Sequence, residues 1–261
     1  MNNMSNLMPT LFIGHGSPMN TIEENEFTKG WREIASKVPH PDAILCVSAH
    51  WYTSNSMIGA MKQPRTIHDF YGFPPELYQQ QYPAPGAPNL AKTISKRLED
   101  YSINLDQSWG LDHGTWSVLK QMYPDANIPT LQLSIDYTKP PRFHFKLGQQ
   151  LDFLRNQGVL IIGSGNLVHN LAAVNWYNQN SQYYWAQEFE EKILDSLSSD
   201  NIAVFIDFEN MKDIGKKAHP SLDHYLPLVY AKGAAKESGN IELFNRRIIM
   251  GSISMACLKF G

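Results

Sequence analysis

The chain has 261 residues, 43% of them hydrophobic, which is enough to bury the core of one large α/β domain or two small ones. We expect a single domain over residues 1–261. The 22 basic and 25 acidic residues are scattered and leave a net charge of −3, which argues against nucleic acid and anionic membranes as partners. A small-molecule ligand is expected instead.

The two cysteines, Cys46 and Cys257, lie far apart in apolar runs without CxxC spacing. This pattern favours buried free thiols in a reducing compartment over a disulfide. The sequence does not open with a signal-peptide pattern, and no apolar stretch approaches the roughly 18 residues that would span a bilayer. A cytoplasmic protein is therefore expected, and nothing in the pattern favours a dimer over a monomer.

Taken in chain order, apolar runs bounded by glycine, proline or polar residues predict strands. These runs are residues 10–15, 43–50, 57–61 and 130–135, a run that begins after Gly158, and a final strand or hairpin at 247–260. Periodicity, caps and charge order predict helices at residues 21–38, 88–101, 116–123, 142–156 and 183–198, and one that begins near Leu222 and is kinked or interrupted at Pro227.

Strands that alternate with helices of this size predict an α/β fold. We expect a mostly parallel central sheet flanked by helices, with an antiparallel addition from the C-terminal run. In such sheets, ligands bind beyond the carboxyl ends of the strands.

The segment 63–88 has few regular signals but many aromatic residues, so it is expected to be a wall or lid beside the site. Aromatic side chains suited to a flat substrate are proposed as its walls, although the same residues would equally suit the core. They are His68, Phe70, Tyr71, Phe73 and Trp51.

Several of the nine histidines follow predicted strands. His15 and His50 end two separate strands, and His169 follows a third; His224 is the next candidate. Neutral imidazole is the commonest protein ligand for Zn, Fe, Cu and Ni, so these side chains predict a metal site with an open position. The remaining candidates, His40, His144 and His219, are interpreted as surface or core histidines.

A serine hydrolase that uses Ser17 or Ser164 is discounted, because neither residue lies in a G-x-S-x-G turn. Two functions of different classes stay open for a histidine site of this kind. One is a zinc-dependent hydrolase or amidase that uses the same histidines, and the second is a non-catalytic protein that binds a metal or a partner.

A set of short motifs occurs in one order along the chain: GHGSPM (14–19), SAHW (48–51), IHDFYGFP (67–74), YPAPG (82–86), WGLDHG (109–114), GSGNLVHN (163–170), HYLP (224–227) and GSISM (251–255). With these motifs the sequence resembles the DODA-type extradiol aromatic ring-opening dioxygenases over nearly its whole length. Within them it is most similar to the bacterial 4,5-DOPA dioxygenase extradiol group of the class III extradiol superfamily.

The resemblance implies a mononuclear, non-haem metal site. By position, His15, His50 and His224 match the metal ligands of the family. His169 is implied as a fourth ligand or an acid/base group, and His113 as a second active-site histidine. The third protein ligand of the wider class is a glutamate, where this chain has His224, so the site is expected to hold one divalent ion, Fe(II) for turnover or Zn(II) as found bound.

The implied reaction is extradiol cleavage of a catechol such as L-DOPA at the 4,5 position, with O₂, to a semialdehyde. In this interpretation His169 is the base that deprotonates the catechol, and His113 hydrogen-bonds the bound oxygen or donates a proton to it.

Overall fold

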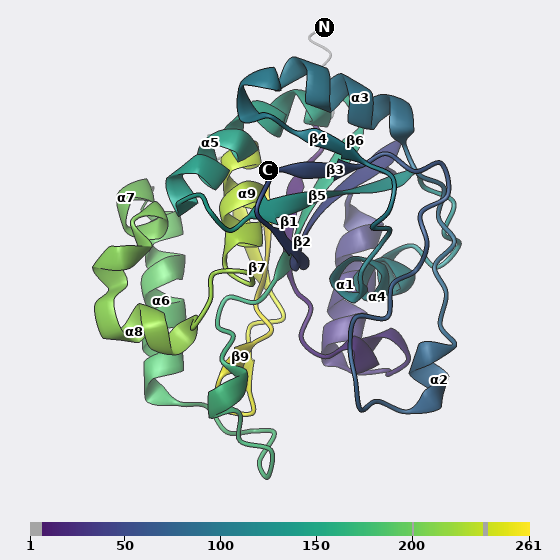
Figure 1. The fold of residues 1–261 in the computed structure, drawn as a ribbon. Helices are drawn as coiled ribbons and strands as arrows, with labels where there is room; N and C mark the ends of the chain where they lie inside the picture. Colours follow the sequence, from purple (N-terminus) through teal and green to yellow (C-terminus); the bar gives the residue numbers. More distant parts are fainter. Residues whose placement is uncertain (1–6, 200, 237–239) are drawn as a thin grey trace, which may run out of the picture.

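An eight-stranded sheet runs through the middle of the molecule (Figure 1), in the order β4-β3-β5-β2-β6-β1-β10-β7. The structure is a computed structural model that describes residues 7–199, 201–236 and 240–261. The strands of this sheet are β1 (Thr10–Gly14), β2 (Ala43–Thr53), β3 (Met57–Gly59), β4 (Asn104–Asp106), β5 (Thr130–Asp136), β6 (Val159–Gly165), β7 (Ile241–Phe244) and β10 (Cys257–Phe260). A small separate ladder pairs β8 (Ile248–Ile249) with β9 (Ile253–Ser254).

The centre of the sheet is parallel, because β2 pairs with β5 and β6, and β6 pairs with β1, all in the same direction. The antiparallel additions are β10 against β1, β7 against β10, and β3 against β5. The expected α/β fold with a mostly parallel sheet is therefore confirmed. The strands that lead to His15, His50 and His169 are neighbours, and their carboxyl ends share one edge.

Helices cover both faces of the sheet (Figure 1), with α1 and α4 on one side and α5 and α9 on the other. The α-helices are α1 (Glu26–Lys37), α2 (Pro75–Tyr78), α3 (Pro88–Arg97), α4 (His113–Met122), α5 (Pro141–Gln150), α6 (Tyr184–Ser198), α7 (Ile202–Ile206), α8 (Lys212–Ala218) and α9 (Leu226–Ala235). The alternation of side chains along the strands divides the core in two: Leu45 and Val47 face one apolar cluster, and Ile44 and Cys46 the other.

The first and the last of the predicted helices differ from the sequence prediction for local reasons. The helix expected from residue 21 begins at Glu26, because Pro18–Thr21 forms a 3₁₀ turn and the Asn25 side chain caps the next helix by accepting from the backbone N–H of Thr28. The kink expected at Pro227 is wrong: this proline lies in the first turn of α9, where its missing N–H costs no hydrogen bond.

The two cysteines are buried free thiols, as expected. Among the described residues, no helix combines the length and the apolar character needed to cross a bilayer.

Candidate active site

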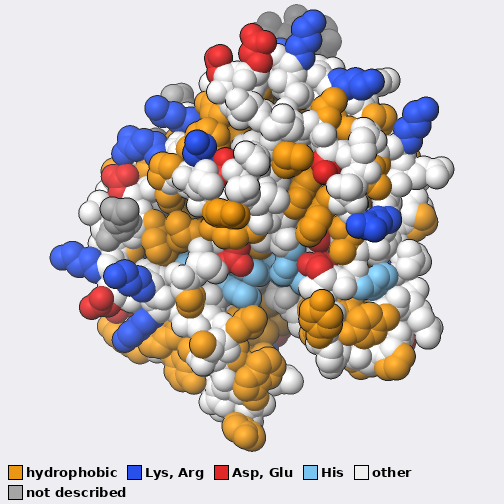
Figure 2. All heavy atoms as spheres, in the orientation of Figure 1, with side chains coloured by type: hydrophobic (Ala, Val, Ile, Leu, Met, Phe, Trp, Pro, Cys, Tyr) orange, Lys and Arg blue, Asp and Glu red, His pale blue; other side chains and the backbone are white. Residues whose placement is uncertain are grey.

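Histidine side chains gather on the floor of a hollow between two lobes of the molecule, with acidic side chains beside them (Figure 2). β1 ends at Gly14, immediately before His15, and β2 carries His50 near its end. His169 lies in the segment after β6, and His224 lies in the turn before α9. The fold therefore brings together side chains that are far apart in the sequence.

Three of these rings form a nearly equilateral triangle. The ring centroids of His15 and His50 are 5.1 Å apart, and both are 5.2 Å from the ring centroid of His224. Nε2 of His15 faces Nε2 of His50 at 3.2 Å.

Two further histidines lie against this triangle. The His169 ring stacks on the His224 ring with a centroid distance of 3.4 Å and an angle of 7°. The His113 ring lies 3.8 Å from the His50 ring, and one nitrogen from each of His15, His50 and His113 lies within 4.8 Å of the others. All five histidines that the sequence pointed to therefore converge, and the set of His15, His50 and His113 has the spacing to hold a metal ion.

Burial keeps the central imidazoles neutral. Desolvation lowers the pKa of His15 and His50 well below 6.5, and the surrounding imidazoles lower it further. Neutral imidazole is the form that binds a metal, because its free nitrogen keeps a lone pair. The buried Nδ1 of His224 also has no hydrogen-bond partner among the described residues.

Ser164 fixes the tautomer of His15. Its hydroxyl donates to the backbone carbonyl of Gly114 at 2.5 Å, so its oxygen accepts from Nδ1–H of His15 at 3.0 Å. The proton of His15 is therefore on Nδ1, and the lone pair is on Nε2, the atom that faces His50.

Asp69 is a site residue to which the sequence patterns assign no role. One of its oxygens lies 3.0 Å from Nδ1 of His113 and 3.3 Å from Nδ1 of His50, and the other accepts from the backbone N–H of His113 at 2.8 Å. Burial raises the pKa of Asp69, but hydrogen bonds and charge interaction with His113 outweigh this and leave the pKa below its usual value. The carboxylate is therefore ionised beside both rings.

His113 is the first residue of α4, and Asp112 caps that helix. The Asp112 carboxylate is fully buried and accepts from the Ser48 hydroxyl and the Gln132 amide, each at 2.7 Å. It thereby ties the start of α4 to β2 and β5. The sequence predicts this helix only from residue 116, with His113 in a loop. This start is wrong, because the buried Asp112 caps the helix and lets it begin at His113.

The turn that carries His224 packs directly on β6. A Cβ added at Gly165 would lie 2.2 Å from the backbone carbonyl of His224, so only glycine allows this approach. The carboxylate of Asp223 lies 3.1 Å from Nδ1 of His224, without the direction of a hydrogen bond.

The proposed aromatic walls divide into different environments. Phe70 is buried and packs edge-on against His113 at 5.6 Å, and Phe73 packs against Phe70 at 5.3 Å. Trp51 is buried and stacks on Trp109 at 5.7 Å. Tyr71 is 92% exposed, so its expected place in a packed wall is wrong.

The remaining histidines are outside the cluster. His40 is exposed. His144 is buried in the core, where its ring contacts the Tyr230 hydroxyl at 3.0 Å. His219 is also buried, and its Nε2 lies 2.9 Å from the Leu167 carbonyl.

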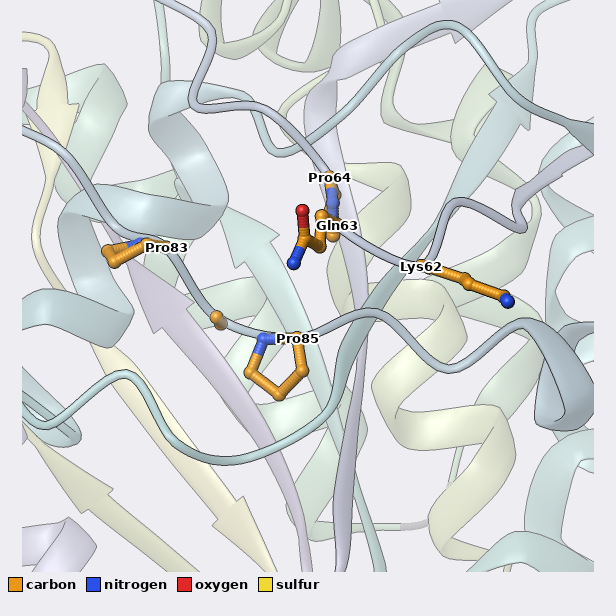
Figure 3. A pocket seen from close by; sticks show the side chains of 6 residues that line it. Lys62, Gln63, Pro64, Pro83 and Pro85 are labelled. Carbon is orange, nitrogen blue, oxygen red and sulfur yellow. The ribbon is translucent and has the colours of Figure 1, made fainter.

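A separate pocket of about 690 Å³ lies between two loop segments (Figure 3). It is lined by Lys62, Gln63, Pro64, Pro83, Ala84 and Pro85 and shares no residue with the histidine cluster. Its lining offers no ring nitrogen or carboxylate, so the side-chain chemistry places the candidate site at the histidines.

Comparison with known proteins gives a consistent result. The chain is 44% identical to a 4,5-DOPA dioxygenase extradiol of Escherichia coli K12, over 98% of this chain and 96% of that one. It is 38% identical to the Beta vulgaris protein of the same name, over 100% of this chain and 99% of that one. A crystal structure of an uncharacterized E. coli K12 protein is similar with a TM-score of 0.85 and 40% identity, covering 97% of this chain and 100% of that one.

Residues 9–254 match the family model described as the catalytic LigB subunit of aromatic ring-opening dioxygenase. This match and the full-length relatives agree with the histidine cluster at the carboxyl edge of the sheet. The chain belongs to the LigB family of aromatic ring-opening dioxygenases.

Proposed function

We propose that this protein opens the ring of a catechol such as L-DOPA by extradiol 4,5-cleavage, with O₂, to a semialdehyde. The names of relatives at 44% and 38% identity over nearly the full chain support the substrate class. The observation that carries the proposal is the 3.2 Å approach of the Nε2 atoms of His15 and His50, with the His224 ring at equal distance from both.

His15, His50 and His224 are the proposed ligands of one divalent ion. Three imidazoles that share an ion at about 2.0–2.1 Å with tetrahedral angles have ring centroids about 5 Å apart and ring nitrogens about 3.4 Å apart. The observed centroid distances of 5.1, 5.2 and 5.2 Å agree with this geometry. One nitrogen of each ring lies beside a neighbouring side chain: Ser164 for His15, Asp69 for His50 and Asp223 for His224.

His169 and His113 are proposed to act beside the ion. The His169 ring lies 3.4 Å from the His224 ring, too close for both to bind one ion at a tetrahedral angle. A nitrogen of His113 does lie within 4.8 Å of those of His15 and His50, but the His113 ring is only 3.8 Å from the His50 ring, closer than two tetrahedral ligands, and its Nδ1 is engaged by Asp69. We therefore assign His169 to proton transfer rather than to a fourth ligand position. Burial and the neighbouring His224 lower its pKa, so the imidazole is neutral and one of its nitrogens carries a lone pair.

His113 is held with Nδ1–H on Asp69, which leaves its Nε2 as the free nitrogen. This nitrogen is proposed to hydrogen-bond the reacting oxygen. Phe70, edge-on to His113, is proposed to keep water from that side of the ring.

When bound, a divalent ion lowers the pKa of the catechol hydroxyls, and Fe(II) also supplies the redox path to O₂ that Zn(II) lacks. Three neutral nitrogen donors suit both ions, so we propose Fe(II) for turnover and Zn(II) as an inactive occupant. A cytoplasmic location is proposed as well, on the two buried free thiols typical of a reducing compartment.

The test is anaerobic loading with Fe(II) or Zn(II), followed by an oxygen-electrode assay over a panel of catechols that includes L-DOPA. Oxygen uptake and a yellow semialdehyde with Fe(II), absent with Zn(II), are expected. Hydrolysis of ester or amide substrates by the Zn(II) form, without oxygen uptake by the Fe(II) form, would instead favour a zinc hydrolase. The variants His15→Ala and His50→Ala are expected to lose both metal and turnover.

A further inference from the structure

We propose that Asp69 is a positioning residue that sets the tautomer and the orientation of His50 and His113 together, and so links the loop 63–88 to the metal centre. This inference rests on the proposed function for the roles of the two histidines. The contacts of Asp69 themselves stand independently of that function.

The geometry places one carboxylate oxygen between two rings. Oδ2 of Asp69 lies 3.0 Å from Nδ1 of His113 and 3.3 Å from Nδ1 of His50. An ionised carboxylate accepts hydrogen bonds and cannot donate them, so its hydrogen bond to His113 favours a proton on Nδ1 of that ring. Its negative charge, 3.3 Å from Nδ1 of His50, favours a proton on that nitrogen as well. In this tautomer, Nε2 of each ring is the nitrogen with the lone pair.

This tautomer matches the tasks of both rings. In His50, Nε2 is the atom that faces Nε2 of His15 at 3.2 Å. Two lone pairs at this distance repel each other unless a cation lies between them, and a metal ion there binds both. In His113, the free Nε2 is left to contact substrate or oxygen.

The second oxygen fixes the carboxylate itself. Oδ1 of Asp69 accepts from the backbone N–H of His113 at 2.8 Å, at the first turn of α4, where the helix dipole favours a negative charge. The side chain of Asp69 is 19% exposed, so the carboxylate is held by these contacts more than by water. The orientation of both rings therefore depends on a residue that lies outside α4 and β2.

An asparagine cannot reproduce this arrangement. Its single carbonyl oxygen can face either the two ring nitrogens or the backbone N–H of His113, and its NH₂ group then meets a donor at the other place. Asp69→Asn therefore tests the acceptor role with little change in side-chain volume. Because the contact with His113 is shorter than that with His50, the His113 ring is expected to respond more strongly.

The matched control is Glu76→Gln. Glu76 is an exposed residue of α2 on the same loop, so this substitution makes the same carboxylate-to-amide change away from the histidines. Thermal unfolding of each variant separates a folding defect from a local one.

The experiment uses the Zn(II)-loaded protein, which needs no turnover. Long-range ¹H–¹⁵N NMR of histidine-labelled wild type is expected to show the Nδ1–H tautomer for His50 and His113. A proton on Nε2 of either ring would overturn the proposal even if Asp69→Asn failed to fold.

Chelator competition is expected to show about 10- to 100-fold weaker Zn(II) binding for Asp69→Asn and no change for Glu76→Gln. Equal affinities for wild type and Asp69→Asn would also overturn it. Since neither measurement involves a catechol, failure of the oxygen-uptake assay alone would count against the proposed reaction and not against this role.

Discussion

The hydroxyl of Ser164 is engaged on both sides, by the Gly114 carbonyl and by Nδ1–H of His15. Removing it leaves the His15 ring without the acceptor that fixes its tautomer, so Ser164→Ala is expected to weaken metal binding by about 10- to 100-fold. Chelator competition measures this, with the exposed Ser36→Ala as a control. If Ser164→Ala bound metal like the wild type, the tautomer of His15 would be set by something else.

A substitution of His169 is expected to affect turnover without affecting metal binding. His169→Phe keeps a flat ring beside His224 but removes both nitrogens, so metal content is expected to stay and kcat to fall by about 10²- to 10⁴-fold, the size of a lost acid/base group. Metal analysis and steady-state kinetics on the Fe(II) form check this. Loss of the metal in this variant would instead support His169 as a ligand.

Single residues differ in how far the sequence could predict them. His15 and His50 were predictable, because each follows an apolar run and parallel strands deliver their ends to one edge. Asp69 was not, because it lies in a loop without periodicity and pairs with a residue on a different element. The sequence motifs of the family supplied His113, and they matched His224, which the local pattern offered only as a further candidate, to a metal ligand.

At the scale of elements, the start of α4 carries much of the site geometry. A Cβ on Gly114 would lie 2.5 Å from the Ser48 hydroxyl and 2.9 Å from Cδ2 of His50, so Gly114→Ala must displace these two side chains of β2. We expect a loss of about 1–3 kcal/mol in the free energy of unfolding, together with weaker metal binding. Gly59→Ala, whose Cβ meets only ordinary contacts from 3.6 Å, is the control in urea denaturation. Equal stability of the two variants would contradict the tight packing of α4 on β2.

The central strands were predictable from the sequence, while several connections were not. A continuous apolar run such as 43–50 strongly favours a buried strand, but the structure extends β2 to Thr53 because that end pairs with β5. The short strands β4 and β7 and the helices α7 and α8 were missed, since segments this short owe their form to their neighbours more than to periodicity.

For the whole molecule, buried histidines make stability depend on pH. Burial lowers the pKa of His144 from 6.5 to about 4, against weaker opposing contacts that include the Lys139 carbonyl. The unfolded chain therefore binds the extra proton first, and the free energy of unfolding falls as the pH drops from about 6.5 towards 4. His144→Gln is expected to remove about 2 kcal/mol of the stability difference between pH 7 and pH 5, as measured by urea denaturation at both values. An unchanged difference would show that His144 is not held neutral by the fold.

The pairing of β1 with β10 joins Thr10 to Phe260 and places the strand that leads to His15 between β6 and β10. Contacts between residues so far apart in the chain form slowly, because a loop of almost the whole chain must close first. During refolding, the helices are therefore expected to appear before the site can capture an ion. In a stopped-flow experiment, the uptake of Zn(II) should lag behind the recovery of the far-ultraviolet circular dichroism signal. The length of this lag then measures how late the metal site forms during folding.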